Sequence, residues 1–150
     1  MEIKFATKND LNEIVELEKS RFLKDPWTEQ MWKYEFEGNQ FSKTLILLDN
    51  QKIIGYVNYW ILFEQATINK VCIDETYQGR GLGDFLLKEA LKNIDREDCI
   101  STSLEVRVSN RPAIKLYEKN VFKISLTKPH YYKDGEDCYF MIRSIGDVYA

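Results

Sequence analysis

A glycine-rich segment over residues 78–83, Gln-Gly-Arg-Gly-Leu-Gly, most constrains how this chain can fold. An apolar run typical of a β-strand, residues 68–73, leads into it, and a helical pattern over residues 82–95 follows. Glycine lets a backbone take positive φ and approach a ligand closely. The first N–H groups of a helix lack internal partners, and the helix dipole adds positive charge there. The segment therefore predicts a strand-to-helix turn that binds an anion such as phosphate, with a plain tight turn as the alternative.

Two common phosphate-binding motifs do not fit this segment. A P-loop requires four residues between its glycines, followed by Gly-Lys-Ser/Thr, and that pattern is absent. A dinucleotide fingerprint requires a glycine at its sixth position, where this chain has Asp84, and it opens a βαβ unit. Here much other predicted structure precedes the glycines. What remains is the pattern Gln-x-x-Gly-x-Gly between a strand and an amphipathic helix.

Length and composition predict a single domain over residues 1–150. The hydrophobic content of 44% is that of an ordinary globular protein, and no apolar run approaches the ~20 residues of a membrane span. The start has no basic region followed by an apolar core, so we expect a cytoplasmic protein without a secretory signal. The net charge of −3, with both signs interspersed, gives no reason to expect nucleic acid or membrane as a partner.

The cysteines and the single histidine do not indicate a metal site. Cys72, Cys99 and Cys138 are odd in number and widely spaced, with neither a CxxC pair nor histidines at zinc-finger spacing. His130 has no motif around it. We therefore expect reduced, structural thiols and no metal.

The hydrophobic patterns predict the element order β-α-α-β-β-β-α-β-α-β-β, an α+β domain with a mixed central sheet and helices on both faces. Thr7 and Asp10 read as a capping box that starts the first helix, and Thr28 as the cap of the second. The expected strands are residues 3–6, 44–48, 53–63, 66–73, 103–108, 122–126 and 138–143. The first expected helix follows the capping box and ends near residue 23. The other expected helices run over residues 28–36, 82–95 and 113–119.

Residues 103–122 carry a more specific pattern: Leu-Glu-Val-Arg at 104–107, Ser-Asn at 109–110 and Ala-Ile-x-Leu-Tyr-Glu at 113–118. Together with the glycine segment, it resembles GNAT acyltransferases of the RimI type, which are bacterial acetyltransferases of the N-terminal alanine of a ribosomal protein. The resemblance runs nearly end to end, from Asp-Pro-Trp-Thr-Glu at 25–29 to Tyr-Tyr at 131–132. It implies the GNAT fold and acetyl-CoA as the co-substrate.

The resemblance also implies site residues. It places the proton acceptor at Glu105 and the proton donor at Tyr117. The acetyl-CoA contacts fall on the strand end, the glycine segment and a later helix start, that is on Val71, Cys72, Ile73, Gln78, Gly79, Arg80, Gly81, Leu82, Gly83, Asp84 and Asn110. The chain departs from the family at 120–122, where Asn-Val-Phe replaces Leu-Gly-Phe. Since asparagine tolerates the left-handed conformation, we expect Asn120 to end this helix in glycine's place.

The residues themselves agree with acyl transfer, which needs a neutral amine, a stabilised oxyanion and a stabilised leaving thiolate. Glu105 alternates with Leu104 and Val106, so it points to the opposite face of the sheet and is a candidate base. A salt bridge to a neighbouring lysine or arginine is the alternative. Taken alone, Tyr117 is better explained as a core aromatic.

The candidate base favours one class of acceptor. At pH 7, deprotonation costs about 1 kcal/mol for an α-amine and about 4.6 kcal/mol for a lysine. A lone carboxylate therefore favours a protein N-terminus, with a ribosomal protein as the expected partner. Trp27, Tyr131 and Tyr132 lie in connections, where they either form the peptide slot or cap the core.

Two other functions remain open. One is acetylation of a small amine, such as a polyamine or an aminoglycoside, by the same fold. The other is a non-catalytic acyl-CoA sensor that acts through a partner. The presence of both Glu105 and Tyr117 argues against the sensor.

Overall fold

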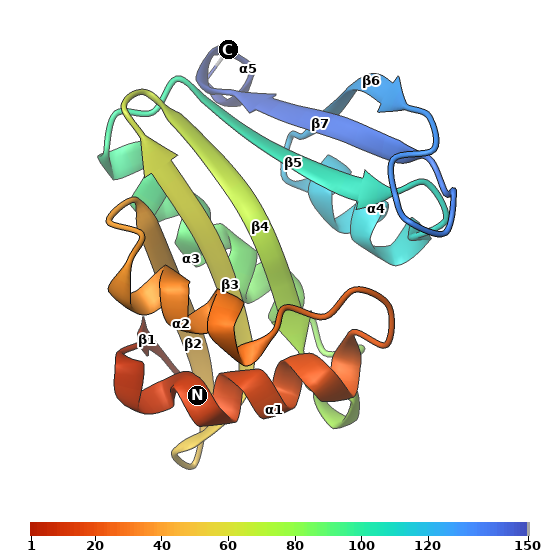
Figure 1. Cartoon of the computed structure of the whole chain (residues 1–150). Coiled ribbons are helices and arrows are strands. Elements are labelled where there is room, and N and C mark those ends of the chain that lie inside the picture. The colour runs from red at the N-terminus through yellow and green to blue at the C-terminus, as the bar shows by residue number, and fades with distance from the viewer. Residues whose placement is uncertain (150) are drawn as a thin grey trace. The chain divides into compact units, whose positions relative to one another are not determined.

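The structure, a computed structural model, describes residues 1–149 (Figure 1). Its strands are β1 (Glu2–Phe5), β2 (Ser42–Asp49), β3 (Lys52–Leu62), β4 (Gln65–Ile73), β5 (Ser101–Arg107), β6 (Lys123–Lys128) and β7 (Cys138–Ser144). Its α-helices are α1 (Leu11–Arg21), α2 (Glu29–Glu37), α3 (Leu82–Arg96), α4 (Arg111–Lys119) and α5 (Ile145–Val148). Two 3-10 helices, η1 (Lys8–Asp10) and η2 (Glu75–Tyr77), precede α1 and the glycine segment. The predicted order is confirmed, while η2 and α5 were not predicted.

The strands form one seven-stranded mixed sheet in the order β1-β2-β3-β4-β5-β7-β6. The pairing of β4 with β5 is parallel, with Gln65 opposite Ser101 and Ile68 opposite Leu104. The β1–β2, β2–β3, β5–β7 and β6–β7 pairs are antiparallel. The predicted fold class, α+β with a mixed sheet, is therefore correct.

The contacts of the chain divide it into two compact units. The first comprises Met1–Trp60 and Lys70–Leu91, and the second comprises Ile61–Asn69 and the chain from Lys92 onward. Both β4 and α3 contribute residues to each unit.

Neighbouring residues of β3 show how helices cover the sheet in the first unit. Tyr56 is buried against Trp32 of α2, with 5.1 Å between the ring centroids. Gly55 faces the other way, where an added Cβ would lie 3.6 Å from Leu86 of α3 and 2.8 Å from the carbonyl oxygen of Cys72. Because side chains alternate along a strand, α2 and α3 cover opposite faces, and α1 lies on the α2 side (Figure 1). Glycine at 55 allows β4 and α3 to approach closely.

The caps predicted for the first two helices are present. Thr7 and Asp10 form the capping box at η1, with Thr7 N donating to Asp10 Oδ2 at 2.8 Å. Thr28 accepts from Met31 N at 3.1 Å and starts α2. Helix α1 ends at Arg21, earlier than predicted, because Phe22 adopts an extended conformation with φ −106° and ψ 90°.

A buried carboxylate ties the connection between α1 and α2 to the sheet. Glu18 is fully buried and accepts a hydrogen bond from the Tyr56 hydroxyl and another from Trp27 N at 2.7 Å. The ammonium of Lys70 on β4 pairs with it at 2.9 Å and also lies 4.0 Å from the ring centroid of Phe22. These partners offset the cost of removing the carboxylate from water.

In the second unit, β5 and α4 provide buried side chains, among them Leu104, Val106, Ile114 and Tyr117. The end of α3 is held to β7 by Arg143, which donates to both oxygens of Asp95 at 2.9 Å. Such a two-point contact fixes orientation as well as charge.

The prediction that Asn120 takes the left-handed conformation is wrong. Asn120 has φ −101°, and the left-handed residue is Val121, with φ 72°. The side chain of Asn120 instead donates to Leu116 O at 2.9 Å, and Phe122 N donates to Tyr117 O at 3.1 Å. The reversal therefore falls at position 121, where the family that this chain resembles has glycine. A β-branched residue is strained there, since its Cβ crowds the backbone.

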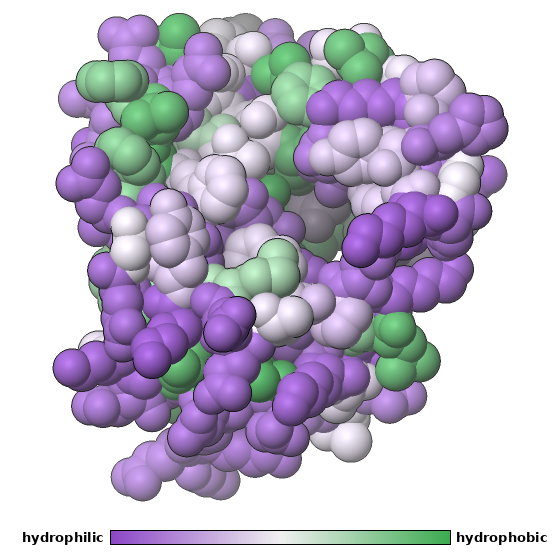
Figure 2. All heavy atoms as spheres, in the orientation of Figure 1, coloured by the Kyte–Doolittle hydropathy of each residue, from purple (hydrophilic) through white to green (hydrophobic). Residues whose placement is uncertain are grey.

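On the face shown in Figure 2, hydrophilic residues predominate and hydrophobic ones appear in small separate groups. Among residues 1–149, no helix has the length and apolar character needed to cross a membrane.

Candidate active site

The glycine segment forms a turn suited to an anion. Gly79 and Gly81 have φ values of 79° and 75°, and a Cβ added at either would meet no atom within 4 Å. Phe85 N donates to Gly81 O at 3.1 Å, so the preceding N–H groups belong to the first turn of α3, where helices leave them without internal partners. Gly83, the last glycine of the segment, lies in the first turn of α3, as the predicted helix over residues 82–95 implies. The turn therefore presents open backbone at a helix N-terminus.

Side chains anchor this turn at its start. Arg21 Nε donates to Ile73 O at 3.1 Å, and its guanidinium lies beside the Gln78 amide. Asp74 accepts from Thr76 N at 2.9 Å, a hydrogen bond that lowers the pKa of its carboxyl group. The anchors fix where β4 ends and where the glycine segment begins.

Cys72 has its side chain in the core of the first unit rather than at the surface. Its thiol is buried with Tyr56, and burial raises its pKa to about 12, so it stays protonated. Only the backbone of Cys72 is therefore suited to contact a ligand. Arg80, in contrast, is exposed and lies over the ring of Tyr77, with 5.1 Å between its Cζ and the centroid.

Glu105 lies on the exposed face of β5, whereas Leu104 and Val106 are buried, as the alternation predicts. Its Oε2 pairs with Lys128 Nζ at 2.5 Å, and its Oε1 accepts from the Tyr131 hydroxyl at 2.9 Å. Both carboxylate oxygens thus have a donor. The salt bridge that was the alternative to a catalytic role is present, with about a third of each charged side chain exposed.

Arg107, two residues further along β5, contacts other residues of the connection between β6 and β7. Its Nη1 pairs with Asp134 at 2.9 Å and with Glu136 at 3.0 Å, and its Cζ lies 4.0 Å from the ring centroid of Tyr132. The rings of Tyr131 and Tyr132 meet edge to face, 5.2 Å apart. Glu105 and Arg107 together therefore position both tyrosines.

Hydrogen bonding and burial both reinforce the charge states of the groups near Glu105. The carboxylate of Glu105 raises the pKa of Lys128 and also that of Tyr131. Burial raises the pKa of Tyr132. At neutral pH, Lys128 is therefore a cation and both tyrosines are neutral donors.

Tyr117 is buried, and burial raises its pKa to about 12. Its ring packs against that of Phe122. Full transfer of its proton to a thiolate with a pKa of ~8.5 would be unfavourable. A hydrogen bond to a developing thiolate suits this phenol better than complete ionisation.

Asn110 and Trp27 both have structural contacts. Asn110 caps α4 by accepting from Ala113 N at 3.3 Å. Trp27 is half-buried against Trp32, with 4.9 Å between the ring centroids. Asn110 thus stabilises the start of α4, and Trp27 packs against α2 in the first unit.

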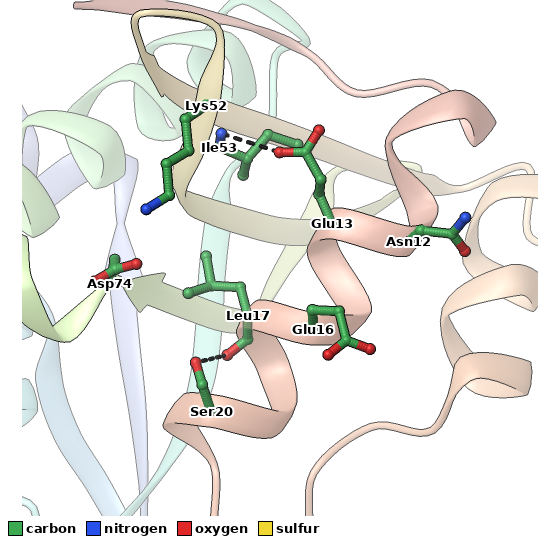
Figure 3. A pocket seen from close by; sticks show the side chains of 8 residues that line it. All are labelled: Asn12, Glu13, Glu16, Leu17, Ser20, Lys52, Ile53 and Asp74. Carbon is green, nitrogen blue, oxygen red and sulfur yellow. Dashed lines mark hydrogen bonds between the residues drawn. The ribbon is translucent and has the colours of Figure 1, made fainter.

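A pocket of about 390 Å³ in the first unit is lined by none of the predicted site residues, although Asp74, one of its lining residues, directly follows Ile73. Figure 3 shows Glu13 directed at the backbone N of Ile53 and Ser20 turned back onto Leu17 O. Two polar side chains of the pocket, Glu13 and Ser20, therefore already have hydrogen-bond partners within the first unit.

Within residues 1–149, no group of three or more histidine, cysteine or acidic side chains is placed to hold a metal. All three cysteines are buried and free.

Comparison with known proteins identifies the family. Residues 10–122, most of the chain, match the family model described as Acetyltransferase (GNAT) family. The chain belongs to the GNAT acetyltransferases. It is thus an N-acetyltransferase that uses acetyl-CoA, and the resemblance read from its motifs is confirmed.

Two sequence relatives and one solved structure show which GNAT proteins this chain is similar to. A Bacillus subtilis (strain 168) protein named after acetylation of the alanine of ribosomal protein bS18 is 33% identical, over 98% of this chain and 100% of that protein. The [ribosomal protein bS18]-alanine N-acetyltransferase of Escherichia coli (strain K12) is 32% identical, over 75% and 76%. The crystal structure of the ribosomal-protein-S18-alanine N-acetyltransferase from Escherichia coli superposes with a TM-score of 0.89 at 27% identity, covering 96% and 93%.

The sequence did not predict the contacts of three residues of the GNAT chain. Lys128 pairs with Glu105 from 23 residues away, a contact that depends on strand register. Arg107 was noted only as part of a motif. Glu18 did leave a signal, because it lies four residues after Ile14 and four before Phe22, within the predicted apolar stripe of the first helix.

Proposed function

We propose that this chain acetylates the α-amine of a protein N-terminus, and that its target is the N-terminal alanine of ribosomal protein bS18. The observation that carries this proposal is the similarity, over most of the chain, to proteins named for that reaction. The target is made in the cytoplasm, so we propose that the enzyme works there, with residues 1–150 acting as one catalytic domain.

Residues of the first unit would supply most of the contacts with coenzyme A, and Asn110 of the second unit is also assigned to it. The pyrophosphate suits the glycine segment, because Gly79 and Gly81 leave open space beside a helix N-terminus. The backbone at the end of β4 would hold the pantetheine arm. The residues assigned to coenzyme A are Val71, Cys72, Ile73, Gln78, Gly79, Arg80, Gly81, Leu82, Gly83, Asp84 and Asn110.

When bound, acetyl-CoA supplies the acetyl group as a thioester. The acceptor nitrogen attacks the carbonyl carbon, the carbon–sulfur bond breaks, and an amide forms. Glu105 would accept the proton that the nitrogen loses, directly or through water. Its position on the exposed face of β5 supports this role. An α-amine, with a pKa near 8, needs less help from such a base than a lysine does.

Tyr117 would stabilise the sulfur as it leaves with negative charge. Its raised pKa keeps the hydroxyl protonated, which supports hydrogen-bond donation to the thiolate, with the final proton reaching sulfur from the hydroxyl or from solvent. Trp27, Tyr131 and Tyr132 would contact the acceptor peptide. The contact of Tyr131 with Glu105 supports placing the peptide N-terminus near the base.

Intact-mass analysis of peptide acetylation tests the proposal. A panel with alanine, serine or methionine first would be compared with the same peptides carrying a blocked N-terminus and an internal lysine, and with spermidine. We expect one acetyl group on free alanine-first peptides and none on blocked ones. Acetylation of spermidine or of internal lysine in preference to every free N-terminus would overturn the proposal.

A further inference from the structure

The carboxylate of Glu105 already holds a cation. Lys128 Nζ lies 2.5 Å from Oε2, and the same ammonium lies 4.9 Å from the ring centroid of Phe140 and 5.2 Å from that of Tyr131. These contacts come from β5, from β7 and from the connection after β6. Lys128 is thus fixed at the group that the proposed function assigns as the base.

We propose that Lys128 is a positioning residue that expels the proton of the bound acceptor amine by electrostatic repulsion. The inference deepens the proposed function and rests on it. An acceptor amine that gives its proton to Glu105 must come close to the carboxylate, and therefore close to this ammonium. Two like charges beside one carboxylate disfavour each other, so the acceptor is held better as a neutral amine than as an ammonium ion.

The surroundings keep Lys128 charged over the working range. The titratable groups that face it are Glu105 on β5, Tyr131 in the connection and the buried Cys138 on β7. Hydrogen bonding to Glu105 raises the pKa of Lys128, and the tyrosine and thiol stay neutral at neutral pH. Arg107 lies further along β5 and pairs with both Asp134 and Glu136, so it adds no net positive charge near Lys128. Lys128 is therefore a constant charge while the acceptor titrates.

The repulsion has a specific kinetic signature. Because a nearby cation lowers the pKa of the bound amine, more of the complex carries the reactive neutral form, and kcat rises at neutral pH. The same repulsion weakens binding of the ammonium form, so KM for the acceptor rises too. The value of kcat/KM, which refers to free enzyme and free amine, changes little.

Lys128→Met removes the charge and keeps a long side chain against the two rings. For an alanine-first peptide at pH 7, we expect kcat and KM to fall together, each on the order of tenfold for a pKa change of about one unit, with kcat/KM within about threefold of wild type. The pH profile of kcat should move about one unit to higher pH. Lys128→Arg keeps the charge and should retain the wild-type profile. Lys123→Met, at an exposed lysine of the same strand, is the matched control.

A binding measurement removes the dependence on turnover. With unacetylated coenzyme A present, calorimetry at pH 6 should show the alanine-first peptide binding about tenfold more tightly to the Lys128→Met variant, because its ammonium then pairs with Glu105 alone. An unmoved kcat profile and unchanged affinity would refute the role of Lys128. So would equal effects of the methionine and arginine variants, which would indicate a packing role. If the wild type acetylates no free N-terminus, the proposed function itself fails, and the inference fails with it.

Discussion

The rings of Phe122 and Tyr117 pack edge to face, with 5.8 Å between their centroids and 62° between their planes. This contact joins the last turn of α4 to the residue before β6, and it places the proposed hydrogen-bond donor inside the core of the second unit. A core role and a catalytic role for Tyr117 therefore have to be separated by experiment.

Tyr117→Phe separates them, because it removes one oxygen and keeps the ring. If the hydroxyl assists the leaving thiolate, kcat should fall on the order of 10²–10⁴-fold, while KM for acetyl-CoA barely changes, since the lost contact forms late in the reaction. Steady-state kinetics and a thermal melt check both quantities. Tyr149→Phe, at an exposed tyrosine, is the control. A folded Tyr117→Phe enzyme with nearly normal kcat would leave Tyr117 a core residue.

Glu105→Gln keeps the shape of the side chain and removes the base. We expect the rate to fall most at neutral pH and to recover partly as pH rises through the pKa of the acceptor amine, near 8, because solvent then supplies the neutral amine. The measurement is the pH dependence of kcat/KM, which reports the free amine, beside the exposed control Glu97→Gln. A loss of equal size at every pH would instead indicate a structural role for the ion pair with Lys128.

Gly81→Val tests the coenzyme site. Valine is strained at φ 75°, and its side chain would fill the open space beside the helix N-terminus. We expect affinity for acetyl-CoA, measured by calorimetry, to fall at least tenfold, about 1.4 kcal/mol. Gly135→Val is a matched control, since Gly135 has φ 88° and equally open surroundings in the second unit. Equal affinity losses in both variants would attribute the effect to backbone strain alone.

Val121→Gly should stabilise the protein. Glycine adopts positive φ without steric strain, whereas its greater freedom in the unfolded chain opposes folding. The relief of strain should be the larger of the two effects, so we expect the free energy of unfolding to rise by about 1 kcal/mol. Denaturant titration checks this value. Val121→Ala shortens the side chain but keeps a Cβ, so it should gain less than glycine. If alanine stabilises as much as glycine does, crowding by the valine side chain is the cause rather than the backbone conformation.

Glu18→Ala should be strongly destabilising. It leaves Lys70, whose side chain is only 13% exposed, without its carboxylate and removes the acceptor for Trp27 N and Tyr56. We therefore expect a loss of about 3–5 kcal/mol in the free energy of unfolding. Glu16→Ala, two residues earlier on the exposed side of α1, should change it by less than about 0.5 kcal/mol. A Glu18→Ala variant as stable as the Glu16→Ala variant would contradict this account of the buried cluster.

The sequence was informative wherever a local rule decides the structure. Alternation placed Glu105 opposite Leu104 and Val106, and the capping residues Thr7 and Thr28 located the starts of their helices. The glycine spacing identified the turn before α3, because positive φ is a property of the residue itself. These features depend on a few neighbouring residues, and so local patterns were sufficient.

Features that depend on strand register were not predictable in the same way. Glu105 meets Lys128 and Tyr131 only because β5, β7 and β6 lie side by side in a particular alignment. The end of α4 also depended on context. Tyr117 O accepts from both Asn120 N and Phe122 N, and this arrangement moves the left-handed position to Val121 despite the preference of asparagine for it.

The buried cluster around Glu18 also has a consequence for the order of folding events. Its hydrogen bond to Tyr56 spans 38 residues of chain, and its other partners come from the α1–α2 connection and from β4. Until all of these segments have docked, the carboxylate is better solvated by water than by an incomplete set of donors. The cluster should therefore form after the transition state, so that its removal accelerates unfolding far more than it slows refolding. Glu18 would then mainly slow the unfolding of the first unit, so it sets how long this unit stays folded rather than how fast it folds.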